Sequence, residues 1–260
     1  MIRPLLTAFV GLQLGMTLCT ALAPAAYAED APDLAAQLKA AMEAPDRPAA
    51  DRARDRNRKP IETLEFFGLR ADMSVLELVP GGGWYTRLLA PTLKDSGQLS
   101  VAIGTTRIEQ GLLKEPGFEA VNVIPIKGEF NRPEGARRFA LKNLSMPATD
   151  IDLALTFRNV HNFDADSRAS MNAAVFSALK PGGHYGIVDH TRRHMDDDNG
   201  ETWRRMDPVQ VIKEALAAGF EFVDYSTLHF RPDDELRYEV GRQTVTGNTD
   251  RFTLLFRKPE

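Results

Sequence analysis

The stretch Ser74–Pro91, SVLELVPGGGWYTRLLAP, decides how this chain folds. Residues 75–79 are apolar except for Glu77, which is the pattern of a short buried strand. Residues 80–83 follow at once as Pro-Gly-Gly-Gly, and residues 84–89 then have the apolar spacing of an amphipathic helix. The stretch therefore predicts a strand, a glycine loop and a helix, the unit from which parallel α/β sheets are built.

The glycine loop is placed where open parallel sheets bind ligands, at the carboxyl end of a strand and the amino end of a helix. Pro80, Gly81, Gly82 and Gly83 would let a ligand approach the backbone closely. Glu77 is a costly residue inside a buried strand unless it orders the loop or meets a polar ligand. The consecutive glycines do not follow the G-x-G-x-x-G pattern, which argues against NAD. A tight turn without a ligand is the alternative interpretation.

The first 28 residues have the pattern of a secretory signal peptide. Arg3 gives a basic start, Leu5 to Leu22 is an apolar stretch, and Ala-Tyr-Ala ends at Ala28. An uncleaved membrane anchor is the alternative, because the apolar run is long enough to span a bilayer. Cleavage would predict a periplasmic or secreted protein without a stable membrane span. It would also remove Cys19, the only cysteine, and with it any disulfide, thiolate catalysis or cysteine metal site.

The composition argues against nucleic acid as a partner. The 260 residues include 32 Lys and Arg against 36 Asp and Glu, a formal net charge of −4, so no global basic field is expected. After the signal peptide we expect an N-terminal helical segment at 29–68 and one α/β domain at 69–260. The run DRARDRNRK at 51–59 is predicted to be a solvated face; alternatively, Arg54, Arg58 or Lys59 closes over the mouth of a ligand site or meets an anionic substrate.

Alternating strands and helices predict a parallel sheet with helices on both faces. No helix is expected between the last two strands, only the polar segment 231–250, so these strands should pair antiparallel. The weakly patterned residues 127–148 are expected to include one helical piece at 134–141. The predicted strands are residues 75–79, 99–103, 121–126, 151–157, 184–189, 220–226 and 251–257.

Several of these stretches together resemble the class I S-adenosylmethionine-dependent methyltransferases. Residues 75–77 with Gly81 and Gly83 resemble the first motif, whose loop holds the aminocarboxypropyl end of the cofactor. FRNVHN at 157–162 and LKPGG at 179–183 resemble the corresponding region of quinone-biosynthesis methyltransferases. A closer resemblance, to a family of predicted, often signal-bearing bacterial methyltransferases, rests on RKP at 58–60, PGGGWYT at 80–86, VDH at 188–190, PDD at 232–234 and TDRF at 249–252.

The resemblance implies a Rossmann-like, seven-stranded, mostly parallel sheet with an antiparallel last strand, and S-adenosylmethionine as the cofactor. Two departures from the family pattern stand out. The second strand normally ends in a carboxylate for the ribose hydroxyls, whereas here Thr105 or Thr106 is a weaker substitute. A family His-Arg-x-Asp segment is replaced by RRMD at 204–207. The implied cofactor-binding residues are Glu77, Pro80, Gly81, Gly82, Gly83, Tyr85, Thr105 and Asn159.

Residues that follow the fourth and fifth strands would face the transferred methyl group. These are Asn159 and His161, then Asp189 and His190. His161 is the preferred general base because the pKa of an unperturbed imidazole lies near neutrality; alternatively it only hydrogen-bonds the turn. Asp189 and His190 have the alternative role of ordering a loop. No metal site is predicted, because His190 and His194 lack the H-E-x-x-H pattern.

The sequence thus predicts an exported methyltransferase that acts on a small molecule. An alternative is an exported, catalytically degenerate methyltransferase fold that binds a ligand or a protein. The missing ribose carboxylate and the expected export both motivate this alternative, because S-adenosylmethionine is made in the cytosol.

Overall fold

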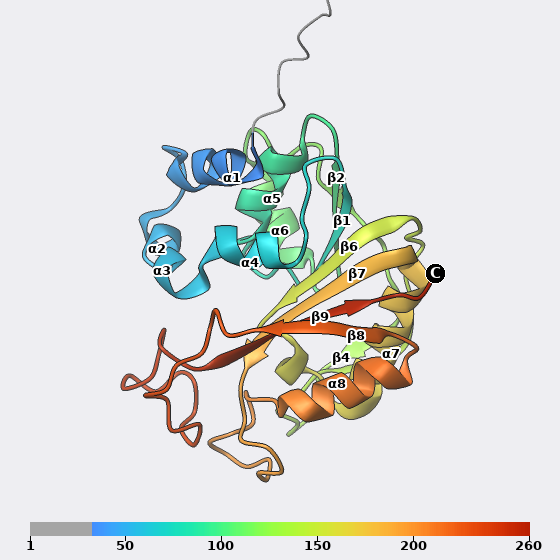
Figure 1. Cartoon of the computed structure of the whole chain (residues 1–260). Helices are drawn as coiled ribbons and strands as arrows, with labels where there is room; N and C mark the ends of the chain where they lie inside the picture. Colours follow the sequence, from blue (N-terminus) through green and yellow to red (C-terminus); the bar gives the residue numbers. More distant parts are fainter. Residues whose placement is uncertain (1–32) are drawn as a thin grey trace, which may run out of the picture. The chain divides into compact units, whose positions relative to one another are not determined.

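The computed structural model describes residues 33–260 (Figure 1). The predicted signal peptide, residues 1–28, lies outside this range. Among the residues that the structure describes, no helix is both long enough and apolar enough to cross a bilayer.

A seven-stranded sheet forms the centre of the fold, with the strand order β3-β2-β1-β6-β7-β9-β8. The first five of these strands are mutually parallel, and β9 runs antiparallel to both of its neighbours. The predicted antiparallel pairing of the last two strands is therefore confirmed. The strands are β1 (Ser74–Leu78), β2 (Gln98–Ala102), β3 (Asn122–Val123), β6 (Ile151–Phe157), β7 (Leu179–His190), β8 (Glu221–Ser226) and β9 (Arg251–Arg257).

Helices cover both faces of this sheet, and each face has its own apolar core. Successive side chains of a strand point to opposite faces, so Val75 joins the core beneath α1, α4 and α5, while Leu76 joins the core beneath α7 and α8. The helices are α1 (Leu34–Glu43), α2 (Ala49–Arg52), α3 (Asp55–Arg58), α4 (Pro60–Phe66), α5 (Thr86–Leu93), α6 (Thr106–Gln110), α7 (Ala165–Ala178) and α8 (Pro208–Ala217), with short 3₁₀ turns η1 (Leu112–Lys114) and η2 (Val160–Asn162).

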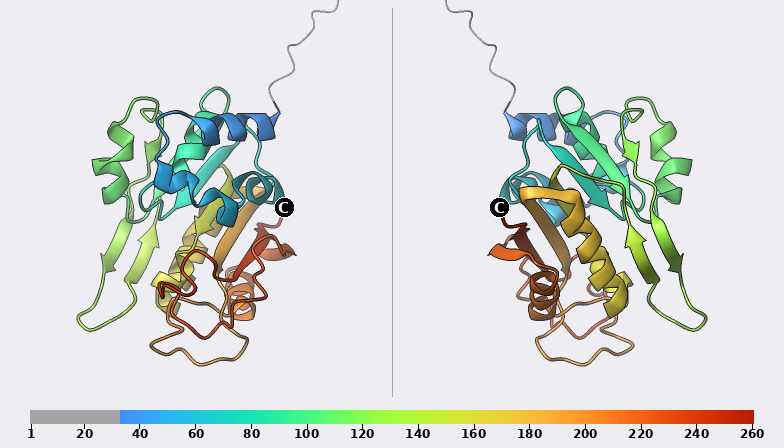
Figure 2. Two further views of the ribbon diagram at one scale, coloured as in Figure 1. Left: turned by 90° about the vertical axis from the view of Figure 1, so that its left-hand side faces the viewer. Right: turned by 90° about the vertical axis from the view of Figure 1, so that its right-hand side faces the viewer.

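A β-hairpin replaces the helical piece expected at 134–141. The strands β4 (Lys127–Asn131) and β5 (Ala140–Ser145) pair antiparallel, and the hairpin projects beside the main sheet (Figure 2). The rings of Phe130 and Phe139 lie 5.2 Å apart, and each lies 6.2 Å from Phe163. The prediction was wrong because this long-range aromatic packing, rather than a local period, fixes the segment.

The segment that contains α2 and α3 is fastened to the rest of the fold through its backbone. The indole N–H of Trp84 donates to the carbonyl oxygen of Asp51 at 3.0 Å. The Nε2–H of His229 donates to the carbonyl oxygen of Arg58 at 3.0 Å. Burial lowers the pKa of His229 to about 4, so this imidazole is neutral and keeps an acceptor nitrogen at neutral pH. These bonds hold the basic run 51–59 beside the carboxyl end of β1.

Candidate active site

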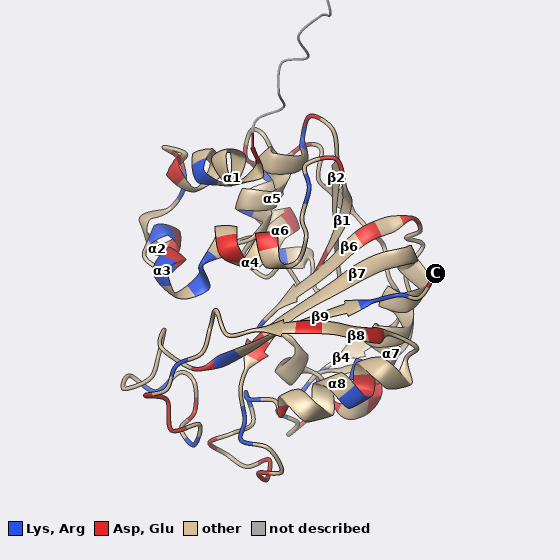
Figure 3. Ribbon diagram, in the orientation of Figure 1, with Lys and Arg blue, Asp and Glu red and all other residues tan. Residues whose placement is uncertain are grey.

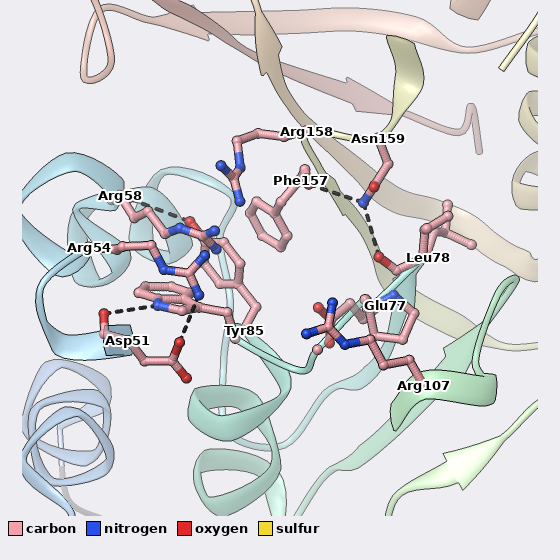
Figure 4. A pocket seen from close by; sticks show the side chains of 15 residues that line it. Asp51, Arg54, Arg58, Glu77, Leu78, Tyr85, Arg107, Phe157, Arg158 and Asn159 are labelled. Atoms are coloured by element: carbon pink, nitrogen blue, oxygen red, sulfur yellow. Dashed lines mark hydrogen bonds and ion pairs between the residues drawn. The ribbon is translucent and has the colours of Figure 1, made fainter. Parts of the chain in front are cut away.

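A cavity of about 310 Å³ lies at the carboxyl ends of β1 and β6 (Figure 4). This is the edge of an open parallel sheet at which ligands bind. Six of the eight predicted cofactor-binding residues line the cavity, whereas Gly83 and Thr105 do not. Its lining consists of residues 77–82 with Trp84 and Tyr85, residues 157–159 after β6, and Asp51, Arg54, Arg58 and Arg107.

The glycine loop has two positions where the backbone needs glycine. Gly81 has φ +61° and Gly83 has φ +82°, a region that other residues rarely adopt. A Cβ at Gly83 would lie only 2.4 Å from Cδ2 of Leu112, whereas a Cβ at Gly81 would meet nothing within 4 Å. Gly83 therefore serves close packing of the loop against η1, and Gly81 leaves open space at the cavity wall.

The chain turns sharply at the ends of three neighbouring strands. Val79, Ile103 and Arg158 follow β1, β2 and β6, and all three have left-handed backbones, with φ of 53°, 64° and 60°. Each such residue costs about 1–3 kcal/mol and such strain gathers at functional sites. The Asn159 amide donates to the carbonyl oxygens of Val79 at 3.0 Å and Phe157 at 3.1 Å. Asn159 therefore holds the loop after β1 against the end of β6.

Glu77 is buried at the base of the cavity, with 3% of its surface exposed. Its Oε2 accepts a hydrogen bond of 2.6 Å from the Thr86 hydroxyl at the start of α5. Burial raises the pKa of Glu77 to about 7, although the Thr86 bond and the charge of Arg58 act in the opposite direction. The two roles considered for Glu77 are thus compatible, because one oxygen orders the helix start while the side chain also borders the cavity.

Thr105 lies beside the cavity rather than in its wall. Its hydroxyl donates to the carboxylate of Glu109, one turn into α6. The residue of this helix that lines the cavity is Arg107, whose guanidinium would lie 3.5 Å from a Cβ on Gly82. The region after β2 therefore contributes a cation to the cavity, whereas the family pattern has a carboxylate for the ribose hydroxyls at the end of this strand.

The three predicted catalytic residues form one buried cluster, and none of them lines the cavity. The Nδ1–H of His161 donates to Oδ1 of Asp189 at 2.6 Å, and the His161 backbone N–H donates to Oδ2 at 3.0 Å. The His190 backbone N–H also donates to Asp189, and its ring lies 5.7 Å from the His161 ring. Burial lowers the pKa of His190 well below its usual value, and the positive charge on neighbouring groups adds to this effect. His190 is therefore neutral at physiological pH.

His194 lies apart from this cluster. Its Nδ1 bonds to Oδ2 of Asp207 at 2.9 Å, and Asp207 also caps the start of α8. Within residues 33–260, no group of three or more His, Cys, Asp and Glu side chains is arranged to hold a metal ion.

Aromatic side chains form one wall of the cavity. The rings of Tyr85 and Phe157 stack at 3.5 Å with an interplanar angle of 11°, and Tyr85 meets Trp84 edge-on at 4.6 Å. The guanidinium of Arg58 lies 4.3 Å from the centre of the Trp84 ring, a cation–π distance. Trp84 thus belongs both to the core and to the cavity.

Sequence reasoning did not assign Arg107, Phe157 and Arg158 to the site. The position of residues 157 and 158 after the fourth strand was an available signal, because strand ends meet at one edge of the sheet. For Arg54 and Arg58, the structure favours the alternative interpretation of the basic run, since both side chains border the cavity.

Comparison with known proteins places the fold. No protein-family model matches this chain, and no curated protein sequence matches it. A SAM-dependent methyltransferase from Aquifex aeolicus has a TM-score of 0.54 at 16% identity, over 86% of this chain and 97% of that chain. The [4+2]-cyclase SpnF has a TM-score of 0.53 at 20% identity, over 81% of both chains. Human N-acetylserotonin methyltransferase, in complex with SAM, has a TM-score of 0.50 at 14% identity, over 88% of this chain and 57% of that chain.

The chain therefore has the Rossmann-like fold of class I methyltransferases, as the sequence predicted. At these identities the likeness concerns the fold, and the cyclase shows that this fold also carries other chemistry. The closer resemblance to signal-bearing bacterial methyltransferases stays a prediction.

Proposed function

We propose that this protein binds S-adenosylmethionine in the cavity at the ends of β1 and β6 and transfers its methyl group to a small molecule. The observation that carries this proposal is that six residues expected around the cofactor line one cavity in a methyltransferase fold. When bound, the cofactor supplies a methyl group on a positively charged sulfur.

The residues around the cavity suit such a ligand. The backbone around Gly81 and Gly82 is open to the cavity, so its polar groups would be available to the aminocarboxypropyl end. Glu77 offers a carboxylate that an ammonium group would hold in its ionised form. The stacked pair of Tyr85 and Phe157 gives an apolar surface in the same wall.

In this proposal His161 receives the proton of the methyl acceptor. Asp189 accepts the Nδ1–H, so it fixes the tautomer that leaves Nε2 free to accept a proton. Asp189 also stabilises the imidazolium that would form, and the two backbone N–H bonds keep the carboxylate in place. His161 lies two residues after Asn159, in the turn that follows β6. A methyl acceptor on the β6 side of the cavity would therefore lie nearest to His161.

Binding of S-adenosylhomocysteine, the product that the cofactor leaves after methyl transfer, tests whether the cavity binds the cofactor. Calorimetric titration of the protein with S-adenosylhomocysteine is expected to give micromolar affinity, about −8 kcal/mol. Gly82→Leu is the site variant, because Gly82 has no left-handed backbone and a Cβ there meets only the mobile end of Arg107 at 3.5 Å. We expect this variant to keep its melting temperature and lose binding. Arg193→Gln, at an exposed position, is the matched control.

Two results would contradict the proposal. One is a wild-type protein that shows no binding heat and no rise in melting temperature at millimolar ligand. The other is a Gly82→Leu protein that binds as tightly as the wild type. The first result would favour the alternative of a methyltransferase fold without its cofactor.

We further propose that the protein is exported, on the strength of the signal-peptide pattern in residues 1–28. An exported enzyme would need a supply of S-adenosylmethionine outside the cytosol. Expression of the full chain in a bacterium, followed by fractionation and mass spectrometry of its N-terminus, is expected to show a periplasmic protein that begins at Glu29. A cytosolic protein with an intact N-terminus would refute export.

A further inference from the structure

The cavity contains more positive charge than its own carboxylates balance. Arg58, Arg107 and Arg158 line it, and within the described chain none of the three forms an ion pair. Arg54 is different, because it pairs with Asp51 at 2.7 Å. In Figure 4 the guanidinium groups of Arg54, Arg58 and Arg158 come together on one side of the cavity, and Arg107 lies on the other side.

Arg58 and Arg158 are placed where charge is expensive. Only 6% of the surface of Arg58 is exposed. Burial, and then the positive charge of Arg158, lower the pKa of Arg58 to about 8; burial also lowers the pKa of Arg158. Arg58 is buried and Arg158 is half-buried, and two such neighbouring cations destabilise a fold unless an anion joins them. The same chain pairs its fully buried Arg205 with Asp234 at 2.8 Å. Arg251, which is also buried, instead donates to the carbonyl oxygen of Asn57 at 2.8 Å.

The two guanidinium groups come from two separate elements. Arg58 is the last residue of α3 (Figure 3). Its carbonyl is bound by His229, and its guanidinium lies on Trp84. Arg158 directly follows β6, and its backbone N–H donates to the carbonyl oxygen of Val188 at 2.6 Å. The Arg58 guanidinium and the Arg158 backbone are thus held before a ligand arrives, and a pair of guanidinium groups is suited to a carboxylate or a phosphate group.

The charge of the proposed cofactor does not supply the missing anion. S-adenosylmethionine has one carboxylate against an ammonium and a sulfonium, so it adds net positive charge to the cavity. Glu77 is the only lining carboxylate besides Asp51, which is already paired, and burial makes its proton hard to lose. A second molecule that carries an anionic group would supply the balancing charge.

We propose that the molecule that enters beside the cofactor carries a carboxylate or phosphate group, and that Arg58 and Arg158 bind this group together. The inference rests on the proposed function in taking that molecule to be the methyl acceptor. An acceptor held in this way lies on the β6 side of the cavity, the side from which the chain continues to His161.

Inorganic phosphate is a probe for this subsite. The full chain is titrated with phosphate by calorimetry in low-salt buffer, first alone and then with saturating S-adenosylhomocysteine. We expect phosphate to bind in both cases, at least tenfold more weakly to Arg158→Gln and to Arg58→Gln, and unchanged to Arg193→Gln. Arg158→Lys should retain more affinity than Arg158→Gln, because it keeps the charge. The affinity for S-adenosylhomocysteine should change less than threefold in Arg193→Gln, which does not line the cavity.

Three results would overturn the inference: no phosphate binding, equal binding by both glutamine variants and the wild type, or displacement of phosphate by S-adenosylhomocysteine. Displacement would assign the two arginines to the carboxylate of the cofactor. The protein could also bind phosphate through the two arginines and fail to bind S-adenosylhomocysteine. This result would support the anion subsite and refute the proposed methyltransferase function. If Arg58→Gln fails to fold, the Arg158 variants alone decide the question.

Discussion

Replacement of Glu77 by glutamine should remove a large pH dependence from the stability of this protein. The buried carboxyl has a pKa of about 7 in the folded chain, against an ordinary value of 4.5. Between these values the folded chain keeps a proton that the unfolded chain has released. The free energy of unfolding therefore falls as the pH rises from about 4.5 to 7, and it stays low above that interval.

The size of the effect follows from the two pKa values. At 1.36 kcal/mol for each pH unit, the difference between 4.5 and about 7 is worth about 3 kcal/mol. Glu77 is fully buried, so screening by solvent reduces this figure little. Glu77→Gln has no proton to lose and keeps a group that accepts the Thr86 hydroxyl bond.

Urea denaturation of both proteins at pH values from 4.5 to 8 measures the effect. The free energy of unfolding of Glu77→Gln minus that of the wild type should rise by about 3 kcal/mol across this interval. Contributions from histidines that titrate in both proteins cancel in this difference. Thr86→Val serves as a second test: it removes a bond that lowers the pKa of Glu77, so the fall in stability should extend to higher pH. Parallel pH profiles of Glu77→Gln and the wild type would refute this account of the buried carboxyl.

Three further predictions concern single side chains. Gly83→Ala should lower the free energy of unfolding, measured with urea, by roughly 1–3 kcal/mol, because its Cβ would overlap Leu112 in a left-handed backbone. Gly81→Ala has the same backbone strain but open space around the Cβ, so its effect should be smaller. Equal losses in the two variants would contradict the packing argument. Asp234→Asn should reduce the free energy of unfolding by roughly 3–5 kcal/mol, because it leaves the buried Arg205 charge without its partner; the exposed neighbour Asp233→Asn should change it by less than about 0.5 kcal/mol. His161→Gln should lower kcat for methyl transfer by roughly 10²–10⁴ with unchanged affinity for S-adenosylhomocysteine; an unchanged kcat would assign His161 a structural role only.

The positions of most strands and the place of the glycine loop could be predicted from the sequence because both depend on local patterns. Residues 75–79 are apolar except for Glu77, and residues 151–157 are apolar except for Asp152 and Thr156. The polar segment 231–250 between the last two strands has no helical period. The hairpin of β4 and β5 could not be predicted in this way, because β4 is exposed along its whole length and is fixed by Phe163 from a distant part of the chain.

The site was only partly predictable for a related reason. A glycine loop is visible in sequence because the backbone demands particular residues, and His161, Asp189 and His190 were found from their positions after strands. The choice between a solvated face and a ligand contact for Arg58 could not be made from the sequence, since basic runs usually face solvent. The position of Arg58 depends on the bond between its carbonyl and His229, 171 residues away along the chain.

The structure divides the family-like motifs into two groups with different consequences for the chemistry. The PDD segment at 232–234 and RRMD at 204–207 meet in the buried ion pair of Asp234 and Arg205. Asp234 also accepts a hydrogen bond from the backbone N–H of Asp250. These motifs therefore hold the polar segment 231–250 in place. Arg204, at the position where the resemblance implies histidine, pairs with Glu239 and does not line the cavity. A histidine at this position would therefore not be expected to act in the cavity. In the proposed function, the chemistry depends on the second group, the residues after β1, β6 and β7, in which Asp189 accepts the Nδ1–H of His161 and Arg158 lines the cavity.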